Sequence, residues 1–165
     1  MLKEKIQNDL TKAMKEGDET TRSVLRVLLA SVQGKEKEKR YKISKIEKGA
    51  SDEELGKKSQ LNDEEIIDVI VSEVKKRNEA SLLFEKGNRK DLADNEKAEM
   101  VILKKYLPEQ MSEEELKKIV QEAVKKTGAA QIKDMGKVMA EVVPQTKGKA
   151  DGAQISKLVK EILTK

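Results

Sequence analysis

The chain has 165 residues, of which 36% are apolar and 40% charged, and Lys+Arg 35 against Asp+Glu 31 gives a net charge of +4. With Cys 0 and His 0, disulfides, thiolate metal sites and the commonest neutral-pH general base are excluded, so we expect no cofactor and no metal. The N-terminal sequence has no apolar run of signal-peptide length, and no stretch approaches the roughly 20 apolar residues of a membrane span, which predicts a cytoplasmic protein with no membrane partner.

Helical periodicity and an aromatic content of 2% predict an all-α fold. A first helix is expected over about residues 2–15, ending at Gly17, and a second begins near Asp18. The apolar face of the second helix ends near Val32. The GKEKEKRYK stretch that follows either stays helical by charge pairing or frays into a loop. Residues 34–60 are charge-biased, and we interpret them as a solvated surface rather than a binding site.

Three later helices begin with a side-chain cap followed three positions later by a reciprocal partner. The three pairs are Asn62 with Glu65, Ser112 with Glu115, and Asp151 with Gln154. They predict helices over about residues 63–86, 113–126 and 152–163.

Two prolines are expected to end the remaining helices, over about residues 91–106 and 132–143. Pro108 follows the first of these helices and Pro144 follows the second. Because Pro108 lies just before a new capping box, we place a domain boundary there. The prediction is a helical N-terminal domain over residues 1–107 and a small three-helix domain over residues 108–165.

No phosphate-binding glycine loop, dinucleotide fingerprint or nucleophile elbow occurs in the sequence. Paired acids such as Glu64 and Glu65 lie in first turns, where the helix dipole explains them. Glu73 has lysines three or four positions away, which is typical of surface ion pairs. We therefore assign no catalytic residue.

Residues 132–143 predict an amphipathic helix whose apolar stripe contains Ile132, Gly136, Val142 and Val143, with Val138 outside it. A glycine in that stripe suggests that a neighbouring helix packs very closely there. Met135 and Met139, in the same stripe, are interpreted as core filler rather than as a groove for a partner.

The stretch VVPQTKGKADG, residues 142–152, is either an ordinary turn or a small basic platform. In the second interpretation its lysines project near those of the preceding helix, and exposed backbone N–H groups and clustered ammonium groups hold phosphate oxygens. The candidate site residues are Lys133, Lys137, Lys147, Gly148 and Lys149.

The run KDMGKVMAEVVPQTKGKADGAQISKLVKEIL, residues 133–163, resembles the C-terminal motif of the GatB/YqeY family. Two further stretches, EVKKRN and LADNEKAEMVILKKYLPEQMSEEEL, resemble the middle of that family. The family's DMGKVM falls on residues 134–139 and its GKADG on residues 148–152. The stretch over residues 41–60 is longer than the family's usual connection.

The resemblance implies a free-standing YqeY-like protein, similar to the tail of the GatB subunit of glutamine-dependent tRNA amidotransferases. The tail is associated with tRNA, and the family with carbon–nitrogen ligase activity using glutamine as amido donor. From this we expect a tRNA-interacting accessory module that has no catalytic site of its own and that can also contact a protein of the translation machinery. The alternative is a helical protein–protein adaptor with no RNA role.

Overall fold

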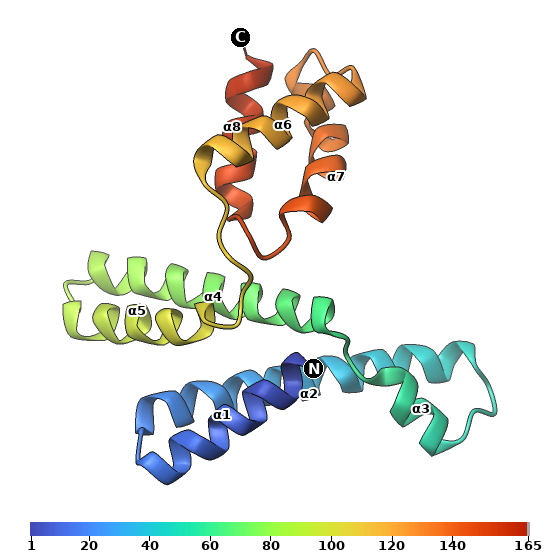
Figure 1. The fold of residues 1–165 in the computed structure, drawn as a ribbon, viewed down its shortest axis with the longest axis vertical. Helices are drawn as coiled ribbons and strands as arrows, with labels where there is room; N and C mark the ends of the chain where they lie inside the picture. The colour runs from blue at the N-terminus through green and yellow to red at the C-terminus, as the bar shows by residue number, and fades with distance from the viewer. Residues whose placement is uncertain (165) are drawn as a thin grey trace. The chain divides into compact units, whose positions relative to one another are not determined.

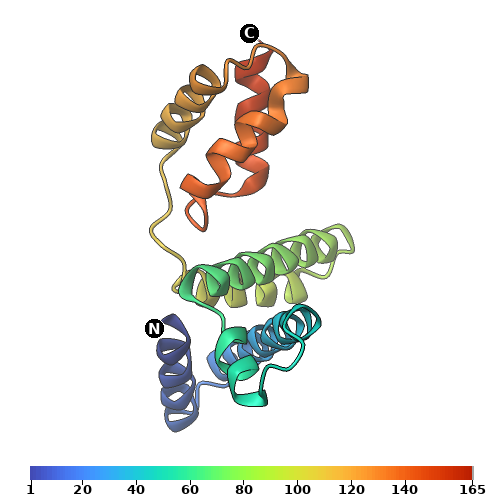
Figure 2. The same cartoon turned by 90° about the vertical axis from the view of Figure 1, so that its right-hand side faces the viewer.

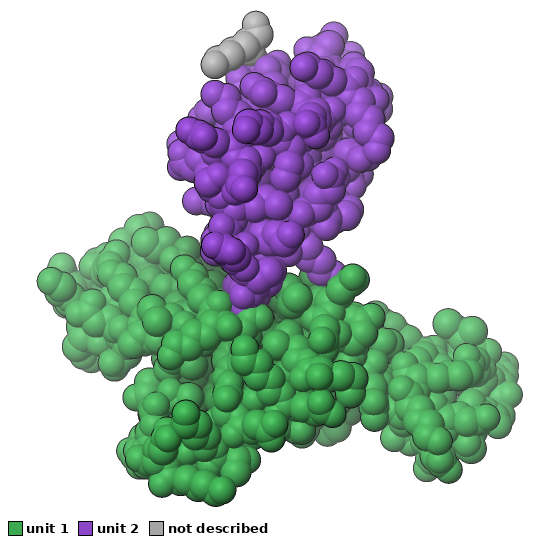
Figure 3. Space-filling model, viewed as in Figure 1, with its two compact units in different colours: residues 1–106 green, residues 107–165 purple. Residues whose placement is uncertain are grey.

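The computed structural model describes residues 1–164, and within them it has eight α-helices, one 3-10 helix and no strand. The all-α prediction is therefore confirmed. The chain divides into two compact units, Met1–Tyr106 and Leu107–Lys165 (Figure 3). In the described part of the chain, no helix combines the length and the apolar character that a membrane crossing requires.

The first unit contains five helices (Figures 1 and 2). They are α1 (Leu2–Glu16), α2 (Glu19–Ile46), α3 (Asp52–Ser59), α4 (Asp63–Lys86) and α5 (Lys90–Lys104). Helices α4 and α5 form an antiparallel hairpin that packs on α2, and α1 lies along α2. The largest fully buried side chains of this unit are Ile6, Leu25, Leu28, Ile66, Ile70 and Leu103. These residues lie on one stripe of each helix, as amphipathic periodicity requires.

The turn between α1 and α2 has the predicted chemistry. Gly17 has φ 72° and ψ 18°, a left-handed conformation that a side chain would strain. Asp18 then caps α2, because its Oδ1 accepts a hydrogen bond from the Thr21 N–H at 2.9 Å. The two helices are thus joined by a turn in which the sequence leaves little conformational choice.

Residues 34–60 are more ordered than their charge suggests. Helix α2 stays helical as far as Ile46, which settles the open alternative for the GKEKEKRYK stretch. Helix α3, which the charge pattern does not predict, begins at a capping box between Ser51 and Glu54. Leu55 and Ser59 are buried where α3 packs on α2. Most other side chains of the segment are exposed, as a solvated surface requires, but one leucine and a capped turn are enough to fix so short a helix on a neighbour.

The second unit contains α6 (Glu113–Thr127), the 3-10 helix η1 (Ile132–Asp134), α7 (Met135–Thr146) and α8 (Gly152–Leu163). Its core consists of Leu116, Val120, Ala123, Val138, Val142, Ile155, Val159 and Leu163. The predicted box of Ser112 and Glu115 is present, as is that of Asn62 and Glu65 in the first unit. Asp151 caps α8 more simply, through the Ala153 N–H at 2.7 Å.

Helix α7 continues through Pro144, so the prediction that this proline ends the helix is wrong. The last turn is held by side chains that bond back to the helix: Thr146 Oγ1 donates to the Val142 carbonyl at 2.9 Å and Gln145 Nε2 to the Glu141 carbonyl at 3.0 Å. A proline costs most in a helix interior, where it removes a backbone bond between two ordered turns. Here the missing backbone hydrogen bond falls in the final turn of α7, and the side-chain bonds of Gln145 and Thr146 support that turn.

Limited proteolysis is expected to cut between helices. Trypsin should cleave first after Lys48, which is exposed in the turn between α2 and α3, and a glutamate-specific protease should cleave after Glu109, which is exposed outside any helix. Mass spectrometry of early digestion products would identify these sites. First cuts inside α4 would contradict this prediction, and a stable fragment beginning near residue 110 would support the predicted division into two domains.

Candidate functional site

The five predicted site residues fall into two groups, one at each end of α7. Lys133 lies in η1 and Lys137 in the first turn of α7, whereas the group of residues 147–149 follows the last residue of α7. Lys137 and Lys147 are ten positions apart, which at a helical rise of 1.5 Å per residue is about 15 Å. The expectation that the turn lysines project near Lys133 and Lys137 is therefore wrong, because a whole helix separates them.

The turn between α7 and α8 is fixed by hydrogen bonds from the segment that precedes α6. Gln110 Nε2 donates to the Gly148 carbonyl at 2.8 Å, and the Met111 N–H donates to the Lys149 carbonyl at 2.8 Å. Gly148 has φ 71°, a left-handed conformation that glycine adopts without strain. The side chains of Lys147 and Lys149 are half-buried. The backbone of the turn is thus held in one conformation by hydrogen bonds, and it carries two lysines.

Two backbone N–H groups of this turn are already engaged. The Lys149 N–H donates to the Thr146 carbonyl at 2.9 Å, and the Ala150 N–H donates to the same carbonyl at 3.2 Å. The expectation that these N–H groups face an anion is wrong, because they close the end of α7. These two N–H groups are not available to a phosphate, which leaves the ammonium groups as the charged donors of the turn.

A third lysine belongs to the surroundings of this turn. Backbone and hydroxyl hydrogen bonds from Ser112 lower the pKa of the Glu115 carboxyl, and the charges of Lys118 and Lys149 lower it further. Lys118 and Lys149 therefore lie near the same carboxylate. The sequence offers a weak indication of this, since Lys118 follows the capping Glu115 by three positions, but its proximity to Lys149 depends on tertiary contacts.

At the other end of α7, an acid offsets one of the two lysines. The backbone N–H of Ala130 lowers the pKa of the Asp134 carboxyl, as does the hydrogen bond from Lys137, whose Nζ lies 3.3 Å from Oδ1. Lys133 is exposed on η1. This end of α7 is thus less positive than the sequence positions of its two lysines suggest.

Helix α7 also carries an exposed apolar strip, and three of its residues, Ile132, Gly136 and Val143, belong to the predicted core stripe, whereas Val142 of that stripe is buried as predicted. We call it the outer face of α7, and it consists of Ile132, Gly136, Ala140 and Val143, all of them exposed. A Cβ on Gly136 would meet nothing within 4 Å, so no helix packs closely there. Val138, predicted to lie outside the stripe, is fully buried.

The wrong assignment of Gly136 to the core and Val138 to the surface has a geometric cause. The predicted stripe is centred on Ile132, which belongs to the 3-10 helix and is 52% exposed. A 3-10 turn advances about 120° per residue rather than 100°, so it shifts the phase of the helix that follows. The true core positions of α7 are Val138, Val142 and Thr146.

The first unit contains a buried charge network that the sequence does not reveal. Glu73 is 5% exposed and Arg77 is 9% exposed. Arg77 Nη1 lies 2.8 Å from Glu73 Oε2, and Arg77 Nε lies 2.9 Å from Glu99 Oε2 on α5. Glu73 Oε1 accepts from Ser31 Oγ at 3.2 Å and from Lys76 Nζ at 2.8 Å. The interpretation of Glu73 as a surface ion-pairing residue is wrong, and the network joins α2, α4 and α5.

These contacts set the charge state of both groups. Burial by itself raises the pKa of Glu73, but the hydrogen bonds from Lys76 and Arg77 outweigh it, so that the pKa is lowered from its ordinary value. For Arg77, burial by itself lowers the pKa, and the bonds to Glu73 and Glu99 again outweigh it, so that the pKa is raised. Glu73 and Arg77 are therefore both charged at neutral pH, and their partners fix them in place.

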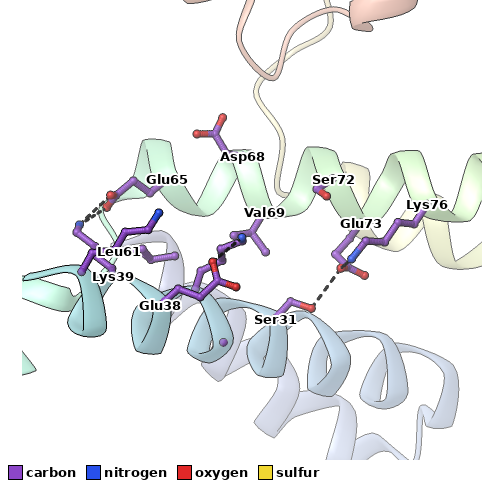
Figure 4. Close-up of a pocket in the computed structure, with 13 residues that line it drawn as sticks. Ser31, Glu38, Lys39, Leu61, Glu65, Asp68, Val69, Ser72, Glu73 and Lys76 are labelled. Atoms are coloured by element: carbon purple, nitrogen blue, oxygen red, sulfur yellow. Dashed lines mark hydrogen bonds and ion pairs between the residues drawn. The ribbon is translucent and has the colours of Figure 1, made fainter. Parts of the chain in front are cut away.

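A groove of about 640 Å³ lies between α2 and α4, with this network at one end (Figure 4). At the other end Lys39 Nζ lies 2.8 Å from both carboxylate oxygens of Glu65. The lining has four lysines and four acids, namely Lys35, Lys39, Lys42 and Lys76, and Glu38, Glu65, Asp68 and Glu73. Because the charges balance and several are paired within the groove, its lining does not favour an anion over a cation.

Comparison with known proteins identifies one family. Residues 34–163 match the family model described as YqeY-like protein. A search of the curated proteins found no match. The matched range begins within α2 and includes both the α7–α8 turn and the Glu73–Arg77 network.

Proposed function

The chain belongs to the YqeY-like protein family, and from this we propose that it is an accessory protein that binds tRNA without catalysing a reaction itself. In this proposal it acts alongside an amidotransferase of the carbon–nitrogen ligase class, with glutamine as amido donor, much as the GatB tail does. The binding surface is the α7–α8 turn, where Lys147 and Lys149 contact the phosphate backbone.

The observation that carries the proposal is the way this turn is fixed. Gln110 and Met111 hold the turn through the carbonyls of Gly148 and Lys149, so that both lysine side chains start from ordered backbone. Ordered attachment lowers the conformational entropy that is lost when ammonium groups are positioned on phosphates. Lys118 adds a third positive charge near the turn, and the Glu115 carboxylate offsets one of the three. Phosphate contacts dominate the affinity of proteins for nucleic acids.

Charge reversal at the two ends of α7 tests the proposal with a matched pair of variants. Lys147→Glu/Lys149→Glu is expected to weaken tRNA binding at least about tenfold and to lower the salt dependence by about 0.9 for each phosphate that the variant no longer neutralises. Lys133→Glu/Lys137→Glu changes the net charge equally but alters the other end of α7, and we expect it to leave most of the affinity. Titrations at low and moderate salt would measure both effects.

Two outcomes would overturn the proposal. Equal losses of affinity in the two double variants would mean that attraction depends on total charge rather than on the turn. A wild-type chain that shows no salt-sensitive tRNA binding would exclude tRNA as the partner. Circular dichroism provides the folding control, since neither variant alters a residue of the hydrophobic core of this unit.

A second candidate function is the protein–protein adaptor, which is favoured by the outer face of α7. Ile132 is 52% exposed and Val143 is 45% exposed, with the small residues Gly136 and Ala140 between them. An apolar strip with small residues at its centre suits the apolar face of a partner's helix. Such binding would change little with salt and would be abolished by Val143→Asp, while the lysine variants would retain it.

A further inference from the structure

The C-terminal half of α2 has one side packed and the other exposed to solvent. This half extends beyond α1 and runs beside α3 (Figure 1). On its other side three exposed residues follow one another at intervals of four positions, and we call them the α2 ridge: Lys37, Tyr41 and Lys45. Residues four positions apart on a helix are neighbours on one face, so the ridge places an aromatic ring between two ammonium groups.

Tyr41 is exposed in a chain with few aromatic residues. The sequence has Tyr 2, Phe 1 and Trp 0. Tyr41 is 64% exposed, whereas Tyr106 is 8% exposed and donates a hydrogen bond from its hydroxyl to Asp9 at 2.7 Å. Lys45 Nζ lies 5.2 Å from the centroid of the Tyr41 ring, a cation–π contact that leaves most of the side chain in solvent. An aromatic side chain so placed contributes nothing to the core and presents a stacking surface.

The charges around the ridge differ from those on the packed side of α2. There, cations are paired with acids: Lys39 with Glu65 and Arg40 with Asp52, both at 2.8 Å. Along the ridge the positions four apart, from 33 to 45, are Gln33, Lys37, Tyr41 and Lys45, with no acid among them. Of the two acids that flank Lys37 in the sequence, Glu36 lies 2.6 Å from Lys3 and Glu38 lies 2.8 Å from Lys35. The ridge is therefore complementary in charge to an anion.

We propose that the α2 ridge binds unpaired nucleotides of an RNA strand, with a base stacked on Tyr41 and neighbouring phosphates held by Lys37 and Lys45. Stacking on an exposed aromatic requires a base that is not paired, whereas ammonium groups on both sides suit a continuous backbone. The ridge lies in the first unit, so its binding does not depend on the α7–α8 turn and extends the proposed function to a second surface.

A membrane surface is a less suitable partner. Binding in the plane of a lipid headgroup layer requires a contiguous apolar face beneath the basic residues. The strongly exposed apolar residue nearby is Ile46, at 82%. It follows Tyr41 by five positions, so it points about 140° away from the tyrosine around the helix axis. The two side chains therefore cannot enter one apolar layer together.

Fluorescence anisotropy with a labelled 12-nucleotide oligouridylate tests the proposal, because this RNA has no stable pairing of its own. Tyr41→Ala is expected to weaken binding about 5- to 100-fold, the range that corresponds to loss of one stacked base. Tyr41→Phe keeps the ring and should stay within about twofold of wild type. Lys37→Gln/Lys45→Gln should lower the salt dependence by about 0.7 for each phosphate that the variant no longer neutralises.

The matched control is Lys57→Gln/Lys58→Gln on α3, where both lysines are exposed and paired with Glu53 and Glu47. This variant has the same charge as the ridge variant and should bind the oligonucleotide as wild type does. Tyrosine fluorescence gives a second readout, because stacking should quench emission in wild type and not in Tyr41→Ala.

Three results would overturn the inference: no oligouridylate binding by wild type, equal affinity for wild type and Tyr41→Ala, or equal losses of affinity in the ridge and control variants. Binding to phosphatidylglycerol vesicles that disappears in Tyr41→Ala, without RNA binding, would instead identify a lipid surface. Lys147→Glu/Lys149→Glu should still bind the oligonucleotide, so failure of the tRNA proposal and failure of this one can be distinguished.

Discussion

Val138→Asp is expected to unfold residues 107–165 while the helices of the first unit remain. Val138 is fully buried in the core formed by α6, α7 and α8. An unpaired carboxylate there costs several kcal/mol. A unit of this size has a total stability of roughly 3–9 kcal/mol, at about 0.05–0.15 kcal/mol per residue. Amide NMR spectra would show loss of dispersed signals from α6–α8 and retention of those from α1–α5.

The matched control for this variant is Gly136→Ala, two positions away. Because a Cβ at Gly136 meets nothing within 4 Å, the added methyl group should stabilise the second unit by a few tenths to about 1 kcal/mol. Thermal melts of the two variants would therefore move in opposite directions. A destabilised Gly136→Ala together with a native-like Val138→Asp would show that the core and outer faces of α7 had been exchanged.

Arg77→Met is expected to destabilise the first unit by about 3–5 kcal/mol, because it leaves the buried Glu73 carboxylate without its closest cation on Oε2. Lys76 and Ser31 bond only the other oxygen and cannot replace it. The double variant Glu73→Met/Arg77→Met removes both charges and should be less destabilised than Arg77→Met alone. Chemical denaturation of wild type, both single variants and the double variant would measure this. Additive losses of stability in the double variant would mean that the two charges do not interact.

The charge state of Glu73 adds a pH dependence to the same experiment. Since the pKa of Glu73 is lowered in the folded chain from an ordinary value of 4.5, ionisation of Glu73 stabilises the fold above about pH 4.5. That contribution disappears as the pH falls through the folded-state pKa, because the unfolded chain then binds the proton first. The difference in free energy of unfolding between wild type and Glu73→Gln should therefore shrink as the pH is lowered from about 6 toward about 3.

Helix starts could be predicted from sequence because capping is local. Asn62 and Ser112 each find their partner three residues away, and no distant contact is needed to form the box. Helix α3 begins with the same signature, in Ser51 and Glu54. The high charge of the segment argued against a helix there, but the local capping pair is the feature that the structure follows.

The burial of side chains was harder to predict, because it depends on helix phase and on neighbours. One 3-10 turn before α7 was enough to exchange Gly136 and Val138 between surface and core. Glu73 looks like a surface residue in the sequence because its lysine neighbours lie three or four positions along the helix. Its ion pair with Arg77 is buried because α5 packs there and adds Glu99 as a second partner of Arg77. Candidate lysines could be named from sequence, but their separation by α7 could not.

The contacts of Tyr106 and Gln110 have a consequence for how binding at two surfaces would combine. The Tyr106 hydroxyl is bonded to Asp9 of the first unit, and Gln110 is bonded to Gly148 of the second, so three residues remain between the two anchors. Three residues span at most about 10 Å, and Pro108 favours an extended conformation at the residue before it. The connection between these two anchors therefore has few conformations of its own, so little linker entropy would be lost if both units bound the same strand.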